Sequence, residues 1–180
     1  MRKPVCTVIV GLPGLGKSSM LSFVDDPEFG DTVFVYSTDR FIEEAAKQFG
    51  ITYTDAFKDN ISNAITSMDA LLDKAIEERI DVYWDQTNLT VAKRNIIITK
   101  MTAAGYDVRC FCILPPEEGH ISDLKVWKHR LDNRPGKVIP SEVLSSMSRS
   151  FVVPSCKEGF SRVSLYNLYG YLLADSYAND

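Results

Sequence analysis

The chain has 180 residues, of which 45% are hydrophobic and 24% charged, and its formal net charge is −4. This composition is typical of a globular domain and excludes disordered, collagen-like and low-complexity chains. The length predicts a single domain over residues 1–180, and no transmembrane helix is expected because no apolar run reaches about 18 residues.

Short apolar runs alternate with helical patterns along the chain. Strands are predicted at residues 5–10, 32–36, 81–84, 107–114 and 161–165. Helices are predicted at residues 16–24, 41–49, 55–76, 91–104, 116–131 and from residue 141. This alternation favours a three-layer α/β fold, in which helices cover both faces of a parallel sheet. Ligands of such folds bind at the carboxyl ends of the strands, so those ends are searched first for chemistry.

A glycine-rich loop joins the first strand to the first helix and reads Gly-Leu-Pro-Gly-Leu-Gly-Lys-Ser over residues 11–18. This is the phosphate-binding P-loop pattern, and the flanking strand and helix disfavour a turn that binds nothing. Backbone N–H groups attract phosphate oxygens, Lys17 reaches the β- and γ-phosphates, and Ser18 offers its hydroxyl to Mg²⁺. The sequence lacks the Asn/Thr-Lys-x-Asp box that reads guanine, which disfavours a GTPase. The predicted nucleotide-binding residues are Gly11, Pro13, Gly14, Leu15, Gly16, Lys17, Ser18 and Ser19.

Two carboxylates directly follow predicted strands. Asp39 comes after the second strand, where it would either take the proton of an acceptor hydroxyl or cap the next helix. Asp85 follows the third strand, where an acidic residue reaches the water shell of the metal in P-loop proteins, with an Asx-type turn as the alternative. Thr87 and Asn88 add neutral hydrogen-bonding groups beside it.

Basic residues gather in two later segments. Lys93 and Arg94 lie one turn into the fourth predicted helix, where a solvated face is the default and a substrate contact the alternative. Residues 121–150 carry six basic and three acidic residues, and Arg130, Arg134 and Lys137 surround a helix end. Arginines in a lid over about residues 125–150 could clamp phosphate oxygens, although cations also suit the dipole of a helix C-terminus.

Several motifs agree in order and spacing with one family. They are GLPGLGKSS (Gly11–Ser19), STDRF (Ser37–Phe41), DQTNL (Asp85–Leu89), RLDNRPGKVIP (Arg130–Pro140), SEVLSSM (Ser141–Met147) and PSCKEGF (Pro154–Phe160). The chain resembles the P-loop kinases related to the bacteriophage-type polynucleotide 5′-kinase and to the kinase half of eukaryotic polynucleotide kinase–phosphatase. The resemblance implies a P-loop kinase fold with a helical arginine lid, and it implies ATP and Mg²⁺ as cofactors.

The resemblance also implies residue roles. Lys17 and Ser18 would hold the ATP phosphates and Mg²⁺, Asp39 would activate the acceptor hydroxyl, and Arg130 and Arg134 would lie over the phosphates as catalytic arginines. The predicted acceptor contacts are Asp85, Thr87, Asn88 and Arg94, and the predicted metal ligands are Ser18 and Asp85.

Two positions depart from the family pattern. Gln86 replaces the first Asn of an element that is often Asp-Asn-Thr-Asn. Ile42 stands where polynucleotide kinases often carry an arginine that grips the acceptor phosphate, and Arg40 is offset from that position. These departures concern the identity of the acceptor more than the chemistry of transfer.

The expected function is ATP-dependent transfer of the γ-phosphate to a hydroxyl on nucleic acid, most simply a 5′-OH end, with DNA expected over RNA. The resemblance offers a second acceptor, because related phage kinases phosphorylate 5-hydroxymethyluracil within DNA. Such an enzyme extrudes the base, and Tyr36, Trp84 and Trp127 are aromatic candidates to hold it, although each also suits the core. A small-molecule kinase and a non-catalytic nucleotide-binding module are further alternatives.

The remaining features concern the surroundings of the protein. Four cysteines without a CxxC pair and two histidines without metal-ligand spacing predict buried free thiols and no zinc site. The N-terminus lacks a secretory cleavage site, so we expect a cytoplasmic protein without membrane contact, compatible with a phage-encoded protein acting in a host cell. The tyrosine-rich tail would pack either on the sheet edge or against another subunit.

Overall fold

The computed structural model describes residues 2–23, 32–134 and 138–178 of the chain. The predicted end of the first helix near Pro27, the predicted break at Pro135 and Gly136, and Lys137 lie outside the described residues.

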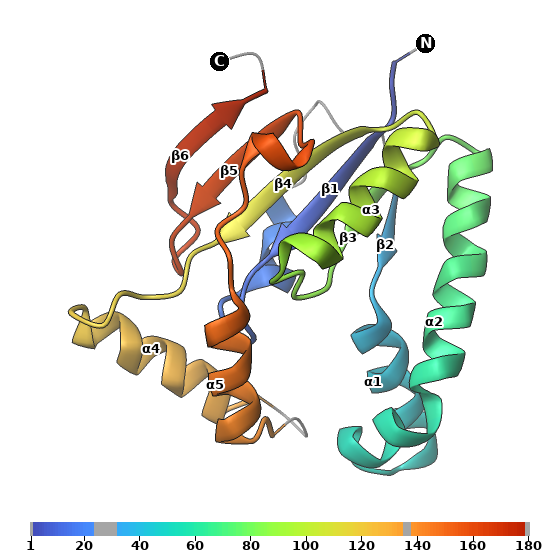
Figure 1. Cartoon of the computed structure of the whole chain (residues 1–180). Coiled ribbons are helices and arrows are strands. Elements are labelled where there is room, and N and C mark those ends of the chain that lie inside the picture. Colours follow the sequence, from blue (N-terminus) through green and yellow to red (C-terminus); the bar gives the residue numbers. More distant parts are fainter. Residues whose placement is uncertain (1, 24–31, 135–137, 179–180) are drawn as a thin grey trace.

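Within the described residues, six strands form one sheet (Figure 1). In chain order they are β1 (Val5–Val10), β2 (Val33–Tyr36), β3 (Asp81–Trp84), β4 (Asp107–Ile113), β5 (Arg162–Tyr166) and β6 (Leu172–Tyr177). Across the sheet the order is β2-β3-β1-β4-β5-β6, with β6 antiparallel to β5 and all other neighbours parallel. The chain places β2 and β3 on one side of β1 and then crosses to the other side for β4, β5 and β6, which places a ligand-binding switch point at the end of β1.

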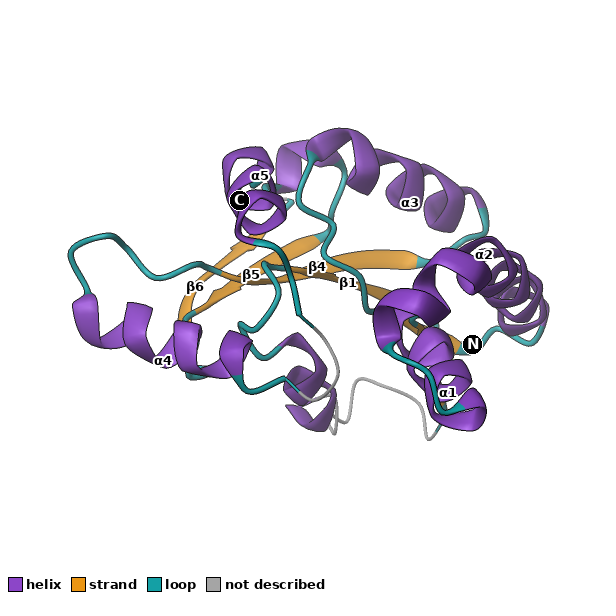
Figure 2. Ribbon diagram, turned by 90° about the horizontal axis from the view of Figure 1, so that it is seen from below, coloured by secondary structure: helices purple, strands orange, loops and turns teal. Residues whose placement is uncertain are grey.

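Helices cover both faces of this sheet, as the sequence predicts, and α3 and α4 lie on opposite faces (Figure 2). The described helices are α1 (Thr38–Phe49), α2 (Tyr53–Glu77), α3 (Val91–Ala103), α4 (Ile121–Asp132) and α5 (Ser141–Ser150), with 3₁₀ turns η1 (Lys17–Phe23) and η2 (Cys156–Glu158).

Alternation along the strands separates two hydrophobic cores. Cys6, Val8 and Val10 of β1 point to the face where α2 and α3 pack. Ile9 points to the other face, where its core includes side chains of η1 and α4. Every residue of β1 is buried, as expected for the central strand of a sheet that is covered on both sides. The loop after β1 therefore starts from a rigid position.

The predicted helix ends at two positions are confirmed. The Thr90 side chain accepts a hydrogen bond from the Lys93 N–H, which caps the start of α3. Gly50 ends α1 with a φ angle of 62°, in the left-handed region that glycine adopts at low cost. The turn between α1 and α2 is short as a result, and the two helices pack against each other.

Three segments differ in detail from the sequence prediction. The first helical segment is a 3₁₀ turn over residues 17–23, a tighter form that is common in short pieces after loops. Helix α4 begins at Ile121 rather than just after Pro115 and Pro116, because a turn closed by the His120 N–H and the Glu117 carbonyl comes first. The tyrosine-rich tail lies on the sheet edge, one of its two predicted alternatives, but it does so as an unpredicted strand, β6, which pairs with β5.

The four cysteines are free thiols, and Cys6, Cys110 and Cys112 are buried as predicted, whereas Cys156 is only half-buried. Cys110 and Cys112 lie on one face of β4, and Phe111 lies on the other. Burial raises the pKa of the Cys112 thiol to about 12, so this thiol stays protonated. Among the residues that the structure describes, no helix combines the length and hydropathy needed to cross a membrane.

Candidate active site

The P-loop follows β1 and requires glycine at two points. Gly14 and Gly16 have φ angles of 78° and 96°, which side chains with a Cβ rarely tolerate. A Cβ added at Gly14 would lie 2.8 Å from Cδ2 of Leu131, so α4 packs directly on the loop. The Gly11 N–H donates to the Thr87 carbonyl oxygen over 3.1 Å. This bond ties the start of the loop to the segment that follows β3.

Helix α4 is fixed to the P-loop by polar contacts as well. The Trp127 indole N–H donates to the Pro13 carbonyl oxygen over 2.8 Å. Arg130 Nη1 donates to the Leu168 carbonyl oxygen over 2.7 Å and to that of Leu15 over 3.4 Å. Arg130 therefore lies beside the loop and holds its backbone. Its catalytic role stays a prediction.

Lysine and serine of the P-loop lie close to the carboxylate that follows β3. The Lys17 ammonium donates to the Leu12 carbonyl oxygen over 3.0 Å, and Tyr83 Oη donates to the Lys17 carbonyl oxygen over 3.2 Å. Ser18 Oγ lies 3.5 Å from Asp85 Oδ2. The structure thus brings Lys17, Ser18 and Asp85 together, as the sequence predicts.

Asp85 is buried, and this burial raises the pKa of its carboxyl. Lys17 opposes the rise, Asp39 adds to it, and the hydrogen bond from Ser18 opposes it. A serine hydroxyl and a carboxylate are oxygen ligands of the kind that Mg²⁺ prefers. Two protein ligands would leave coordination positions for phosphate oxygens and water. Among the described residues, no cluster of three or more His, Cys, Asp or Glu side chains is suited to a metal.

Asp39 lies in the first turn of α1, just beyond the end of β2. The capping alternative for Asp39 is wrong, because the N-cap is Ser37, whose side chain accepts from the Arg40 N–H. The Asp39 side chain is exposed instead, and its Oδ1 accepts a hydrogen bond from Tyr53 Oη over 2.6 Å. Asp39 is thus held by a contact from the start of α2.

These groups line one cavity of about 730 Å³ at the carboxyl ends of the strands, between α1, α2 and α5. Its polar side carries Lys17, Ser18, Asp39 and Asp85. Its far side is apolar and belongs to α2 and to the segment from residue 138 to α5. The apolar lining residues are Phe57, Ile61, Ile65, Val138, Ile139, Pro140, Val143 and Met147. The cavity therefore joins a phosphate-binding end to an apolar wall.

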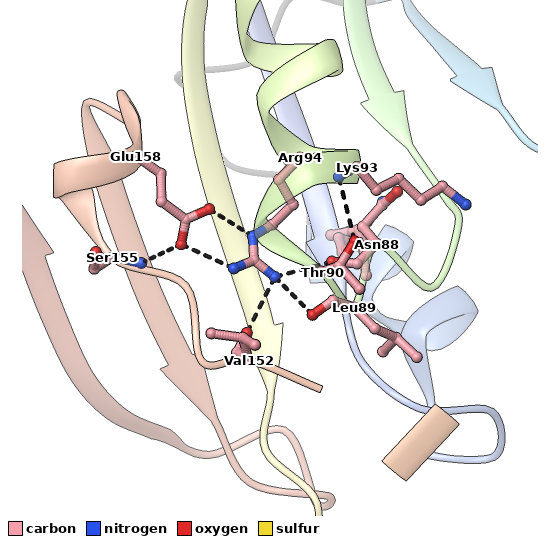
Figure 3. Close-up of polar contacts among 9 residues, drawn as sticks. Asn88, Leu89, Thr90, Lys93, Arg94, Val152, Ser155 and Glu158 are labelled. Carbon is pink, nitrogen blue, oxygen red and sulfur yellow. Dashed lines mark hydrogen bonds and ion pairs between the residues drawn. The ribbon is translucent and has the colours of Figure 1, made fainter. Parts of the chain in front are cut away.

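Two predicted acceptor contacts are wrong (Figure 3). Arg94 is fully buried, and its guanidinium forms a bidentate ion pair with Glu158 at 2.7 and 2.8 Å and donates to three backbone carbonyls. Asn88 is also fully buried, with a φ angle of 48°, and its Nδ2 donates to the Ile9 carbonyl oxygen over 2.7 Å. Burial leaves neither side chain any surface for a substrate. Both fix the backbone that carries Asp85.

The other predicted contacts are divided between cavity and core. Thr87 lines the cavity, and so does Arg134, whereas Arg130 is not among the lining residues. Tyr36 and Trp84 are buried and stack on each other with ring centroids 4.1 Å apart. Tyr36 and Trp84 therefore serve the core, as their alternative interpretation says, and the half-buried Trp127 packs against the core beside the P-loop.

Sequence analysis gave no role at the site to Tyr53 and Phe57, which line the cavity. Arg40 and Lys93 line it as well, although substrate contact was only the alternative for Lys93. Lys93 is an exposed residue, but desolvation of its ammonium at the cavity lowers the pKa of that group, and the nearby Asp39 carboxylate opposes this effect. Lys93 could have been separated from Arg94 by helical geometry, because adjacent residues point about 100° apart around a helix. No local signal identifies Tyr53, since its place opposite Asp39 depends on how α1 packs against α2.

Known protein families and structures resemble this chain in sequence and in fold. A family model described as an AAA domain matches residues 7–154, which include the P-loop, Asp39, Asp85 and Arg134. The chain belongs to this family. The AAA domain of this chain has an α/β, P-loop kinase-like fold. Among curated proteins, none matches the sequence.

Three solved structures illustrate the likeness in fold. A structure of the PezAT chromosomal toxin–antitoxin system of Streptococcus pneumoniae is 17% identical, with a TM-score of 0.60 over 96% of this chain and 72% of that chain. A candidate kinase from Chloroflexus aurantiacus is 12% identical, with a TM-score of 0.56 over 86% and 83%. The Pnkp1/Rnl/Hen1 complex is 20% identical, with a TM-score of 0.51 over 68% of this chain and only 39% of that chain. At these identities the likeness concerns the fold.

Proposed function

We propose that this AAA domain is an ATP-dependent kinase that transfers the γ-phosphate to a hydroxyl on nucleic acid, most simply a 5′-OH end of DNA. The observation that carries the proposal is that Lys17, Ser18, Asp85 and Asp39 line the same cavity. Lys17, Ser18 and Asp85 form the end that we assign to phosphate and metal binding. Asp39 is an exposed carboxylate that accepts a hydrogen bond from a hydroxyl. Phosphoryl transfer requires both parts within one site.

The proposed roles follow from the environment of each group. P-loop N–H groups and Lys17 bind the phosphates of ATP, and Ser18 and Asp85 hold Mg²⁺, which neutralises charge on the phosphate oxygens. Asp39 orients the acceptor hydroxyl and accepts its proton as the oxygen attacks the γ-phosphorus. Arg134 stabilises the charge that spreads over the oxygens of the moving group.

The charge of the cavity supports an anionic acceptor. Five cations line it against three carboxylates: Lys17, Arg40, Lys58, Lys93 and Arg134 against Asp39, Glu43 and Asp85. Ile42 is fully buried between α1 and α2, so no acceptor contact comes from the position where the family often has an arginine. Arg40 and Lys93 offer cations near Asp39 in its place. A phosphodiester beside the acceptor hydroxyl would meet this positive charge.

The solved structures with a similar fold agree with this proposal. One of them is a candidate kinase. Another belongs to a complex that contains Pnkp1, and this chain covers only 39% of the matched chain. These names support phosphoryl transfer as the reaction class, and the acceptor is inferred from the cavity.

The second candidate function is phosphorylation of 5-hydroxymethyluracil within DNA. The observation that favours it is the apolar wall of the cavity, where the rings of Tyr53 and Phe57 lie 6.0 Å apart at their centroids. Enzymes that act on a base in DNA extrude it and hold it against aromatic and apolar side chains. A cavity of about 730 Å³ has room for a base and its hydroxymethyl group.

The deciding experiment is label transfer from γ-phosphate-labelled ATP with Mg²⁺. Two acceptors are compared: an oligonucleotide with a 5′-OH end and ordinary bases, and closed circular DNA that contains 5-hydroxymethyluracil. Label on the oligonucleotide alone supports the end kinase, and label on the circle supports the base kinase, because a circle has no ends. Label on neither, with ATP bound, contradicts both nucleic-acid acceptors.

A matched pair of variants tests the assignment of the base. Asp39→Asn should lower transfer by about 10²–10⁴-fold while ATP binding persists. The control is Asp123→Asn, because Asp123 also lies in the first turn of a helix and accepts a hydrogen bond from a tyrosine, Tyr169, outside the cavity. It should leave transfer unchanged. Normal transfer by Asp39→Asn would show that another group takes the proton.

A further inference from the structure

Tyr53 presents a hydroxyl to the candidate base from within the protein itself. Its Oη donates to Asp39 Oδ1 over 2.6 Å, the distance that a general base requires of the hydroxyl whose proton it accepts. Tyr53 lines the same cavity as Lys17 and Ser18 of the P-loop. A hydroxyl that is hydrogen-bonded to the candidate general base, in the cavity that the P-loop also lines, has the arrangement expected of a phosphoryl acceptor.

The position of this hydroxyl is set by packing. Tyr53 is the first residue of α2, and Thr52 fixes that start because its side chain accepts from the Asp55 N–H. The Tyr53 ring packs on the small core between α1 and α2 that includes Ile42 and Ala56. The ring is therefore held by the same helix contact that places Asp39, and the two side chains keep their relation without a ligand.

We propose that Tyr53 is an internal phosphoryl acceptor, so that the kinase phosphorylates its own acceptor site when no external hydroxyl occupies the cavity. This inference rests on the proposed function, because it uses the same ATP and the same base. In the step, Tyr53 Oη forms a bond to the γ-phosphorus of ATP, and the bond from that phosphorus to the β,γ-bridging oxygen breaks. ADP leaves with the electron pair, and Asp39 takes the phenolic proton. The products are phosphotyrosine and ADP.

The charges around the Tyr53 phenol are the carboxylates of Asp39 and Glu43 and the guanidinium of Arg134. Burial, followed by the hydrogen bond to Asp39, raises the pKa of the phenol, so the free hydroxyl stays protonated and needs a base to react. The positive charge of Arg134 lowers the pKa of the Tyr53 phenol, so Arg134 lies near the ring. The guanidinium of Arg134 would pair with the phosphate once it is attached, as arginines do with phosphotyrosine.

Modification would close the site to other acceptors. A phosphate on Tyr53 would place about two negative charges beside Asp39, and the bond that now holds the base would be lost. An external hydroxyl would then meet both a filled space and like charge. The reaction is thus expected to be slow, limited to one phosphate per chain, and suppressed by a saturating acceptor.

The test is incubation of the full chain with ATP and Mg²⁺ without acceptor, followed by intact mass measurement and peptide mapping. The wild-type chain should gain about 80 Da, at Tyr53 and on one site only. Tyr53→Phe and Asp39→Asn should lose the gain. The matched control Tyr169→Phe, which removes an exposed tyrosine hydroxyl that also binds a carboxylate, Asp123, should keep it. The rate should not change over a tenfold range of about 1 to 10 μM chain, because the reacting groups lie within one molecule.

The outcomes separate this inference from the proposed function. Label on an external acceptor with no mass gain would overturn the internal acceptor and leave the kinase assignment intact. A gain that persists in Tyr53→Phe would also overturn it, since another residue would carry the phosphate. Neither external label nor mass gain, with ATP bound, would overturn both proposals.

Discussion

Replacement of Arg94 by Met should destabilise the fold strongly and leave the chemistry of the cavity in place. The guanidinium makes two charge-assisted bonds to Glu158 and three bonds to backbone carbonyls, all removed from solvent. In Arg94→Met, Glu158 would keep a bond from the Ser155 N–H but lose its counter-ion, although its side chain is only 8% exposed. Removing one partner of a buried pair costs about 3–5 kcal/mol.

Urea denaturation measures this loss directly, and thermal unfolding should show a fall in Tm of about 10 °C for a domain of this size. The control is Lys93→Met, the adjacent residue on the exposed side of α3, which should change the free energy of unfolding by less than about 0.5 kcal/mol. The same two variants are assayed for label transfer below their unfolding temperatures, where folded Arg94→Met should still transfer phosphate.

A double-mutant cycle with Glu158→Gln isolates the pair. If the two side chains stabilise one another, the double variant should lose at least about 1 kcal/mol less than the sum of the single losses. A loss below about 1 kcal/mol in Arg94→Met, together with a large fall in transfer, would refute the structural role. It would restore Arg94 as a substrate contact.

Three further predictions concern the loop, the metal and the transferred phosphate. Gly14→Ala should lower the free energy of unfolding in urea by about 2–4 kcal/mol, because the φ of 78° disfavours alanine and its Cβ would meet Leu131. The control Gly50→Ala should lower it by only about 1 kcal/mol, because its φ is 62° but its Cβ would meet open space. Because burial raises the pKa of Asp85, protons compete with Mg²⁺ for this carboxylate up to a higher pH than for an ordinary aspartate. The Mg²⁺ affinity in calorimetry should therefore rise as the pH rises through that pKa, and this slope should vanish in Asp85→Asn. The same shift makes the metal-free fold less stable as the pH rises from the lower, unfolded pKa. Arg134→Ala should lower label transfer by about 10³-fold with ATP binding kept, and a loss below tenfold would contradict its role.

The fold could be predicted closely where local chemistry decides it. The apolar run of β1 and the P-loop pattern specify a strand and a phosphate-binding turn together, and Thr90 and Gly50 mark helix ends through their own side chains or lack of one. Strand β6 escaped prediction because Leu172–Tyr177 is largely exposed on an edge, so its pairing with β5 leaves no regular apolar alternation.

The candidate site was harder to predict from the sequence, for a physical reason. A charged residue near a strand end can serve substrate or structure, and the choice depends on long-range partners. Arg94 belongs to the structure because Glu158, 64 positions away in sequence, is close enough to neutralise it. Tyr53 enters the site because a turn at Gly50 folds α2 back on α1. Neither of these long-range contacts can be predicted from the residues that flank Arg94 or Tyr53.

Asp39 and Asp85, two of the three carboxylates that line the cavity, have environments that suit the different roles proposed for them. Asp85 is buried beside Ser18 and Lys17, where an ionised carboxylate is costly unless cations compensate it, and this suits a metal site. Asp39 is exposed, lies at the start of a helix whose dipole favours a negative charge, and faces a hydroxyl. Two carboxylates with distinct surroundings divide the work of a site in this way. An exchange of their functions would leave the base without access to an acceptor and the metal without its serine ligand.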